Sequence, residues 1–456
     1  MTSTPTSTPT TNIPVSIPAG SPRPGGLGSA HAVGAAGAPP PATLAGSIPS
    51  ARTVIDRMLY GTPGRMRLLG LVAVIAAIAI GAVSASALLA SRAAVERAAN
   101  TAAQVVRAQS IQVELLRADA LATNAFLVGG LESPASAAGY DEAISRVVTG
   151  LTTAAAAQPA DAAALGALSD DVQTYTSLVE QARSNNRLGL PVGAQYLKEA
   201  SAGLRTNAMP IIRQITSTNE DRAQKEFGRS GSVLLLIVGV VALVALVAVA
   251  VWLARRTHRY LNRSLTAGLV LLVVGLFAAA TTITSVGSAT AGVAANRYQE
   301  AVDLATVRTA ANDARANESL TLISRGSGAT FEKAWQANDA TVTSILRTLG
   351  SGGSLPTLWS DYGKAHTEVR TLDDGGTWDQ AVAKATDEGP SGSAGTFTAF
   401  DTEVSAQRDT ASSDAVAQLT GLGTANPLYA IAIGIASLLA AWLIARGVGQ
   451  RLEEYR

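Results

Sequence analysis

The chain contains no cysteine among its 456 residues. This absence excludes disulfides, thiol chemistry and metal centres or clusters ligated by cysteine. The only three histidines, His31, His258 and His366, do not stand at a spacing that binds a metal ion. We therefore expect no metal and no cofactor, and we expect packing alone to hold the water-exposed parts together.

Charged residues are scarce as well. Asp, Glu, Lys and Arg make up 15% of the chain, against about 25% in ordinary soluble domains. The formal net charge is +1, so no overall field would attract nucleic acid. Hydrophobic residues make up 47% of the chain and the mean hydropathy is positive. This balance predicts a polytopic membrane protein with sizeable water-exposed parts.

The sequence also lacks the signatures of catalysis. It contains no P-loop, no HExxH motif, no GxSxG motif and no kinase signature. We therefore expect that the chain is not an enzyme. Its uncharged apolar runs, 68–90, 231–254, 265–290 and 428–445, contain Ser and Thr but no Asp, Glu, Lys, Arg or His, whereas transporters usually carry such groups within their spans.

Apolar runs predict four transmembrane helices, over residues 61–91, 230–254, 265–290 and 427–446. Arginines flank these runs on one side, and the positive-inside rule makes that side cytoplasmic. Both termini, including the tail 447–456, and the loop 255–264 should therefore be cytoplasmic in a multi-pass protein of the cell membrane. A cleaved signal peptide is the alternative for the first run, which is longer than the usual apolar region of such peptides.

Two cytoplasmic segments have candidate roles. Residues 1–60 are rich in Pro and Thr, and we expect a disordered tail that is either a spacer or a substrate for a serine/threonine kinase. The loop 255–264 is strongly basic. It is either a docking site for a protein or a topology anchor that attracts anionic lipid. Its candidate docking residues are Arg255, Arg256, Arg259 and Arg263.

The two long regions between the spans, 92–229 and 291–426, have the pattern of helical bundles. Apolar residues recur at three- and four-residue steps, and no segment alternates as a strand would. The first helix should continue from the first span to about Val128, and Pro210 should kink the fourth. We predict an all-α fold with four transmembrane helices and two tandem extracytoplasmic helical bundles.

The two halves of the chain resemble each other, which predicts an internal duplication. The pattern D-A-x-A-[TN]-[NE]-x-[FL] fits both 119–126 and 313–320, and the segments YDEAI and FEKAW follow in the same order. Each half carries two spans, so the halves would be parallel repeats with their bundles side by side. A homodimer is an arrangement that the sequence leaves open.

This repeated pattern supplies candidate binding residues, Asp119, Asn124, Asp313 and Glu318. Carboxylate and amide groups that face into a bundle can bind an amino-acid head group or a loop of a partner. The alternative is that they lie on a solvated face or cap a neighbouring helix. The general exposure of charged side chains favours this alternative.

A span, a helical bundle and a second span together resemble the sensor halves of chemoreceptors and histidine kinases. Four spans, two tandem bundles and the junction WLARRTHRYLNRSL over 252–265 are more similar to the GlnX family of actinobacteria. The resemblance implies an amino-acid-binding lipoprotein, GlnH, as the partner outside and the soluble serine/threonine kinase PknG as the partner inside. It carries over no individual functional residue.

These observations lead to one functional hypothesis and two alternatives. We expect a sensory transducer that relays amino-acid availability from a solute-binding lipoprotein to a cytosolic serine/threonine kinase. The first alternative is a direct receptor that binds a small molecule within its bundles. The second is a transport-associated or structural membrane subunit without a signalling role.

Overall fold

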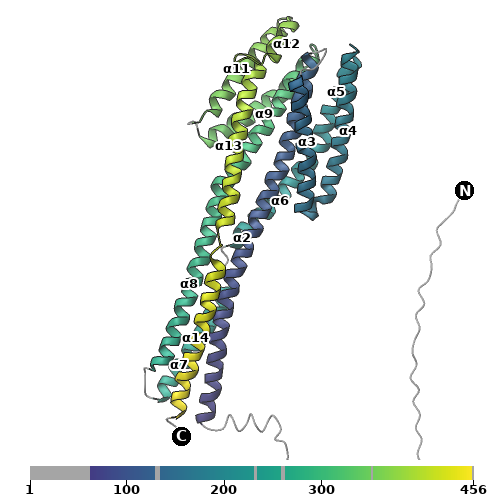
Figure 1. Ribbon diagram of the computed structural model, residues 1–456. Coiled ribbons are helices and arrows are strands. Elements are labelled where there is room, and N and C mark those ends of the chain that lie inside the picture. The colour runs from purple at the N-terminus through teal and green to yellow at the C-terminus, as the bar shows by residue number, and fades with distance from the viewer. Residues whose placement is uncertain (1–61, 129–133, 231–233, 258–261, 351–352, 454–456) are drawn as a thin grey trace, which may run out of the picture. The chain divides into compact units, whose positions relative to one another are not determined.

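A single helix joins the first apolar run to the first water-exposed region. In the computed structural model, α2 runs without interruption from Thr62 to Val128, over 67 residues (Figure 1). This length corresponds to about 100 Å, which is far more than the ~30 Å core of a bilayer. Its two most frequent residues are Ala and Leu, which are strong helix formers. The predicted continuation as far as Val128 is confirmed.

The structure describes residues 62–128, 134–230, 234–257, 262–350 and 353–453. All of them belong to the unit Asp56–Arg456. They form helices and turns, and they contain no strand, so the predicted all-α fold is confirmed. The predicted tail 1–60 lies outside the described residues.

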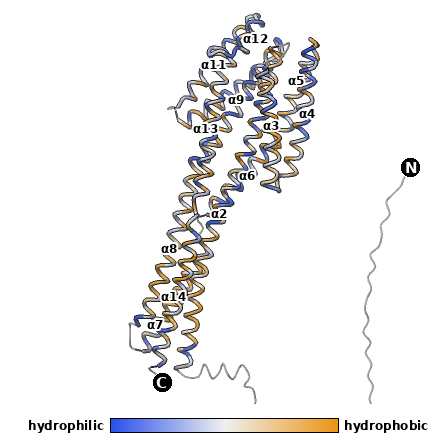
Figure 2. Tube along the Cα trace, in the orientation of Figure 1, coloured by the Kyte–Doolittle hydropathy of each residue, from blue (hydrophilic) through white to orange (hydrophobic). Residues whose placement is uncertain are grey.

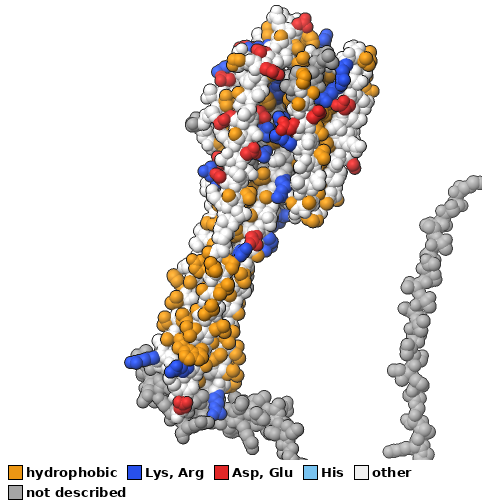
Figure 3. Space-filling view, viewed as in Figure 1, with side chains coloured by type: hydrophobic (Ala, Val, Ile, Leu, Met, Phe, Trp, Pro, Cys, Tyr) orange, Lys and Arg blue, Asp and Glu red, His pale blue; other side chains and the backbone are white. Residues whose placement is uncertain are grey.

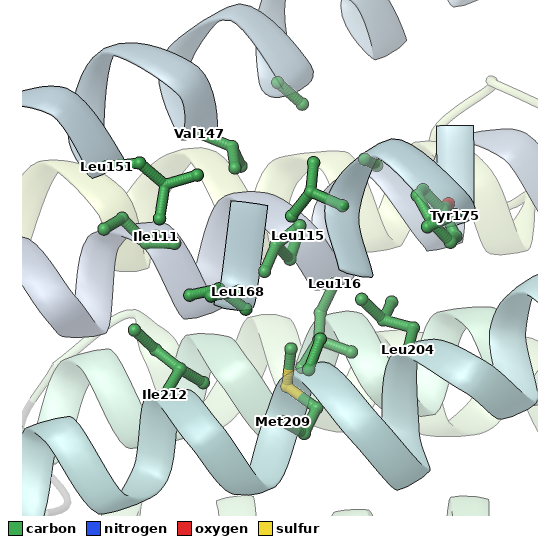
Figure 4. Packing of buried hydrophobic residues seen from close by; sticks show 14 of the residues in the cluster. Ile111, Leu115, Leu116, Val147, Leu151, Leu168, Tyr175, Leu204, Met209 and Ile212 are labelled. Carbon is green, nitrogen blue, oxygen red and sulfur yellow. The ribbon is translucent and has the colours of Figure 1, made fainter. Parts of the chain in front are cut away.

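Bundle 1 consists of the second half of α2 and the helices that follow it: α3 (Pro134–Ala157), η1 (Pro159–Asp161), α4 (Ala162–Arg187), α5 (Val192–Gly203), η2 (Leu204–Ala208) and α6 (Met209–Ser230). Its core is a continuous cluster of mainly aliphatic side chains. Figure 4 shows side chains from several of these helices meeting there, among them Ile111, Leu115, Val147, Leu168 and Ile212. Burial of such side chains contributes roughly 1.5–3 kcal/mol each.

The predicted distortion near Pro210 takes the form of a π-helical turn. The turn η2 spans Leu204–Ala208, and the N–H of Met209 donates to the carbonyl of Leu204. Proline cannot donate the backbone hydrogen bond that an α-helix requires at its position, and a wider turn accommodates this loss. The turn also carries Arg205, and π-helical turns occur often at functional sites.

Bundle 2 follows the same order of elements: α9 (Gln299–Ile323), α10 (Ala329–Leu349), α11 (Leu355–Asp374), α12 (Trp378–Thr386) and α13 (Ser393–Gly421). Its core is more aromatic than that of bundle 1. Trp359 packs against Tyr362 and Phe400, with ring centroids 5.1 and 4.9 Å apart. The same order of helices in both halves is compatible with duplication, which stays a prediction.

The apolar helices are α7 (Leu234–Thr257), α8 (Arg263–Val293) and α14 (Asn426–Glu453), and the π-helical turn η3 (Ala294–Tyr298) joins α8 to α9. The three apolar helices lie alongside the first half of α2, where hydrophobic residues dominate both the trace and the visible surface (Figures 2 and 3). By length and composition, three helical stretches can cross a membrane: Gly64–Val128, Arg263–Ile323 and Ser393–Gln450. A fourth apolar helix, Leu236–Trp252, is shorter, so the count of four spans stays a prediction.

A junction of small residues connects the bundles to the apolar helices. Four helices, α2, α6, α8 with η3, and α13, meet there around a common cluster. In this cluster the rings of Phe227 and Tyr298 pack edge-on, with their centroids 5.6 Å apart. Its other buried members are mostly alanines: Ala98, Ala99, Ala102, Val105, Ala223, Val293, Ala415 and Leu419.

Two of the apolar helices, α2 and α14, approach each other closely at Gly81. A Cβ atom at this position would overlap the Cβ and Oγ of Ser437. The helices α8 and α14 likewise approach each other closely at Gly268, where a Cβ would lie 2.9 Å from the carbonyl oxygen of Ala440. Small residues at such positions let helices pack tightly in a membrane.

We expect Gly81→Ala to lower the thermal unfolding midpoint of the detergent-solubilised chain, because the added methyl group forces α2 and α14 apart. Overpacking of this kind costs about 1–3 kcal/mol. Gly434→Ala on α14 is the matched control, since a Cβ there meets no atom within 4 Å. Equal midpoints for the two variants would contradict the close approach.

Candidate functional site at the interface between the bundles

The two bundles contact each other mainly through α2 and α9. Between Ala310 and Leu322, every residue of α9 except Asp313 is buried. A helix on the surface of a bundle normally buries only one face. The α9 helix is buried all round because bundle 2 covers one side and α2 covers another. Polar groups on it are therefore forced to find partners within the protein.

Arg205 of bundle 1 links a carboxylate in each bundle. Its Nη1 donates to Oδ2 of Asp119 at 2.8 Å, and its Nε donates to Oδ1 of Asp313 at 2.9 Å. Asp119 is completely buried and also accepts from Ser201 Oγ at 2.6 Å. Burial alone would lower the pKa of Arg205, but the two carboxylates outweigh it and raise that pKa above its usual range. The guanidinium is therefore permanently charged.

A second arginine, Arg315 of bundle 2, makes the reciprocal connection. Its Nη2 donates to Oδ1 of Asn124 in bundle 1 at 2.8 Å, while its Nη1 pairs with Glu318 on its own helix. Glu318 also accepts from Ser393 Oγ at 2.7 Å. Burial would raise the pKa of Glu318, but Arg315 and His366 outweigh it and hold that pKa below its usual range.

A third arginine lies on the side of the interface nearer the apolar helices. Arg308 forms a bidentate ion pair with Asp401, in which Nε and Nη2 donate at 2.8 and 2.9 Å. Its Nη1 lies 3.6 Å from Oε1 of Glu114 on α2. The α2 partners of the three arginines are Glu114, Asp119 and Asn124. These three residues are spaced five positions apart on α2, so that neighbouring ones are separated by about 7.5 Å along the helix axis.

His366 extends this network into bundle 2. Its Nδ1 lies 2.7 Å from Glu318 and its Nε2 lies 3.3 Å from Glu332. Its ring stacks on Trp335, with centroids 3.6 Å apart. Burial by itself disfavours the imidazolium, but the two carboxylates prevail and raise the pKa of His366 above its usual value.

The structure brings the four candidate residues from the sequence to this one interface. The expectation that they lie on a solvated face is wrong for Asp119 and Glu318, which are 0% and 1% exposed. Asp313 is partly buried and also accepts from Asn338 at 2.8 Å. Asp119, Asn124 and Asp313 take part in contacts between the bundles, and Glu318 pairs with Arg315, which makes one of these contacts. A ligand- or partner-binding role for these residues stays a prediction.

The basic loop is described only in part. Arg255 ends the apolar part of α7 and is exposed, and Arg263 begins α8 and is also exposed. The backbone of Arg256 belongs to α7, while Arg259 lies outside the described residues. Asn262 caps α8 by accepting from the N–H groups of Ser264 and Leu265. The predicted docking role stays a prediction.

The sequence analysis missed the cations of the interface, Arg205, Arg308 and Arg315. Each stands in a helix among small residues, in the segments LRTNA, ATVRTAA and DARAN. A long cation surrounded by small side chains was the available signal, because neighbouring helices can approach and bury it. The partners are 86, 93 and 191 residues away, so no local pattern could predict these pairings.

Among the described residues, no group of His, Asp and Glu could hold a metal ion. The interface can fix the two bundles in one register, because each arginine has acceptors in both. A sliding movement would leave buried charges without partners, which is costly.

We expect Arg205→Met to destabilise the chain by about 3–5 kcal/mol, since it leaves the buried carboxylate of Asp119 without a cation. Thermal unfolding of the purified protein in detergent measures the loss. The double variant Arg205→Met with Asp119→Leu should regain part of it. Arg213→Gln, which removes an exposed arginine of α6, the helix that follows η2, is the control. If the double variant were less stable than the single one, the pairing argument would fail.

The stability of the chain should fall as the pH rises above about 6.5, the ordinary pKa of histidine. Because the folded-state pKa of His366 is raised, its contribution is complete below that value and is lost as the pH passes through the folded-state pKa. Unfolding midpoints between pH 6 and 9 should decline more steeply for the wild type than for His366→Gln. Parallel curves would show that another group is responsible.

Comparison with known proteins identifies one part of the chain. Residues 93–228, which correspond to bundle 1, match the family model described as an actinobacterial sensor domain. No curated protein and no solved structure matches the chain. Together with the long apolar helices, the match supports a sensory role and a membrane protein, and bundle 1 is the part that is similar to a known sensor domain.

Proposed function

We propose that this chain is a membrane transducer that relays extracytoplasmic amino-acid availability, reported by a solute-binding lipoprotein, to a cytosolic serine/threonine kinase. The observation that carries the proposal is the match of residues 93–228 to a sensor domain whose first helix continues into an apolar span. The amino acid, the lipoprotein and the kinase rest on the resemblance to the GlnX family.

The continuous helix α2 supports signal passage through the membrane. A displacement of bundle 1 along or around this helix reaches the far end directly, because no turn between Thr62 and Val128 absorbs it. A partner outside produces such a displacement only if it binds one arrangement of the bundles better than another. The junction around Phe227 and Tyr298 links α2 to the helices of the second half, so both halves would respond together.

The interface arginines suggest how two arrangements are kept distinct. Arg205, Arg308 and Arg315 each have acceptors in both bundles. A position of the bundles between two such arrangements would therefore leave charges unpaired. Packed polar interfaces of this kind shift between discrete registers rather than deform continuously. Asp119 and Asp313, at matching positions of the proposed duplication, share Arg205, so the two halves of a fused dimer would use the same cation.

The output would come from cytoplasmic segments. In the predicted topology, the basic residues Arg255, Arg256, Arg259 and Arg263 and both termini face the cytosol and move with α7, α8, α2 and α14. A kinase that docks on these cations would sense the change in their spacing. An anionic lipid surface would compete for the same side chains.

In-cell crosslinking, purification in mild detergent and mass spectrometry test the proposal. We expect a solute-binding lipoprotein and a serine/threonine kinase to be recovered with the chain. Arg205→Met should uncouple them, so that amino-acid addition no longer changes phosphorylation of the kinase substrates while both partners are still captured. Arg213→Gln should behave as wild type. Recovery of transporter subunits without either partner would favour a transport role instead.

A further inference from the structure

A cleft of about 560 Å³ opens on bundle 1 at the end nearest the apolar helices. It lies between α2, the α3–η1 turn and α6, and it is lined by Arg97, Arg107, Gln158, Arg222 and Glu226 among others. The whole cleft falls within the residues that match the sensor domain. It is separate from the interface between the bundles.

A buried polar network orders two of these arginines. Gln104, Asp161 and Asn219 lie behind the cleft and are 2%, 6% and 0% exposed. Arg107 donates from Nη1 to Gln104 Oε1 at 3.1 Å, and Arg222 donates from Nη1 to Asp161 Oδ1 at 3.0 Å. Both guanidiniums are thus anchored through Nη1 to the network behind the cleft, and both residues line the cleft.

Cations exceed carboxylates at this cleft. Arg222 is paired with Asp161, and Arg97 is paired with Glu226 at 3.0 Å. Arg107 is the surplus cation, because its partner Gln104 is neutral. A guanidinium presents several donors in a planar fork that fits carboxylate and phosphate oxygens. An ordered surplus guanidinium beside a second one in an open cleft is suited to an oxyanion.

We infer that this cleft binds the anionic oxygens of a phosphate or carboxylate group, with Arg107 and Arg222 as the donors and Arg97 at the rim. The inference does not depend on the proposed relay, since it concerns a ligand bound by bundle 1 itself. Loss of the lipoprotein or kinase partners would leave it untouched.

Such an anion has two sources. Arg97 stands seven residues beyond Ala90, or about 10 Å along α2 from the apolar run, within reach of the headgroups of a bilayer. Arg107 stands about 15 Å further along the same helix, where a soluble anion has direct access. A phospholipid headgroup would therefore engage Arg97 first, whereas a free anion would engage Arg107 and Arg222.

The test uses the full-length protein in a neutral detergent and titrates inorganic phosphate and succinate at constant ionic strength, with chloride as the reference. We expect saturable binding by calorimetry and a higher unfolding midpoint. Arg107→Gln should weaken binding at least about tenfold, because it removes a charge-assisted donor. Arg107 has no carboxylate partner, so this variant should fold, and Arg107→Lys should bind at an intermediate level.

Arg213→Gln is the matched control, since it removes an exposed arginine from α6 outside the cleft. In a second arm, phosphatidylglycerol nanodiscs are compared with phosphatidylcholine nanodiscs. Stabilisation that needs Arg97 and appears only with phosphatidylglycerol would identify the lipid as the source. The inference is overturned if neither arm gives binding that depends on these arginines, or if Arg213→Gln weakens it equally.

Discussion

The contact on which the rest of the structure depends is the one between Arg205 and the buried carboxylate of Asp119. A fully buried carboxylate is tolerated only with a cation and hydrogen-bond donors beside it. The same guanidinium also pairs with Asp313 in the other bundle. Arg205 therefore both neutralises the buried charge inside bundle 1 and attaches bundle 1 to bundle 2.

The position of α9 follows from this arrangement. It is enclosed by its own bundle and by α2, and its two arginines, Arg308 and Arg315, have partners on both sides. An apolar interface would tolerate small shifts, whereas arginines with acceptors in both bundles define a register. The position of the bundles is coupled to that of the apolar helices, because α2 runs without a break from bundle 1 into the apolar part of the protein. The junction around Phe227 packs α6, α8 and α13 against α2.

Much of the architecture could be predicted from the sequence. The apolar runs, the helix periodicity and the lack of breakers between Arg92 and Val128 fixed the order and type of the elements. The repeated pattern singled out Asp119, Asn124, Asp313 and Glu318, and the structure brings all four to one interface. Their burial was not predicted, because exposure depends on whether another helix covers the face on which a residue stands.

The helical class, the apolar helices and the residues of the repeated pattern can be read from the sequence alone, because they depend on periodicity and composition within one segment. The tertiary structure alone decided which cation serves which carboxylate. Arg205, Arg308 and Arg315 find their partners 86 to 191 residues away. Such pairings arise only when packing removes water from helices distant in the chain, so that each buried charge must be satisfied by whatever lies opposite.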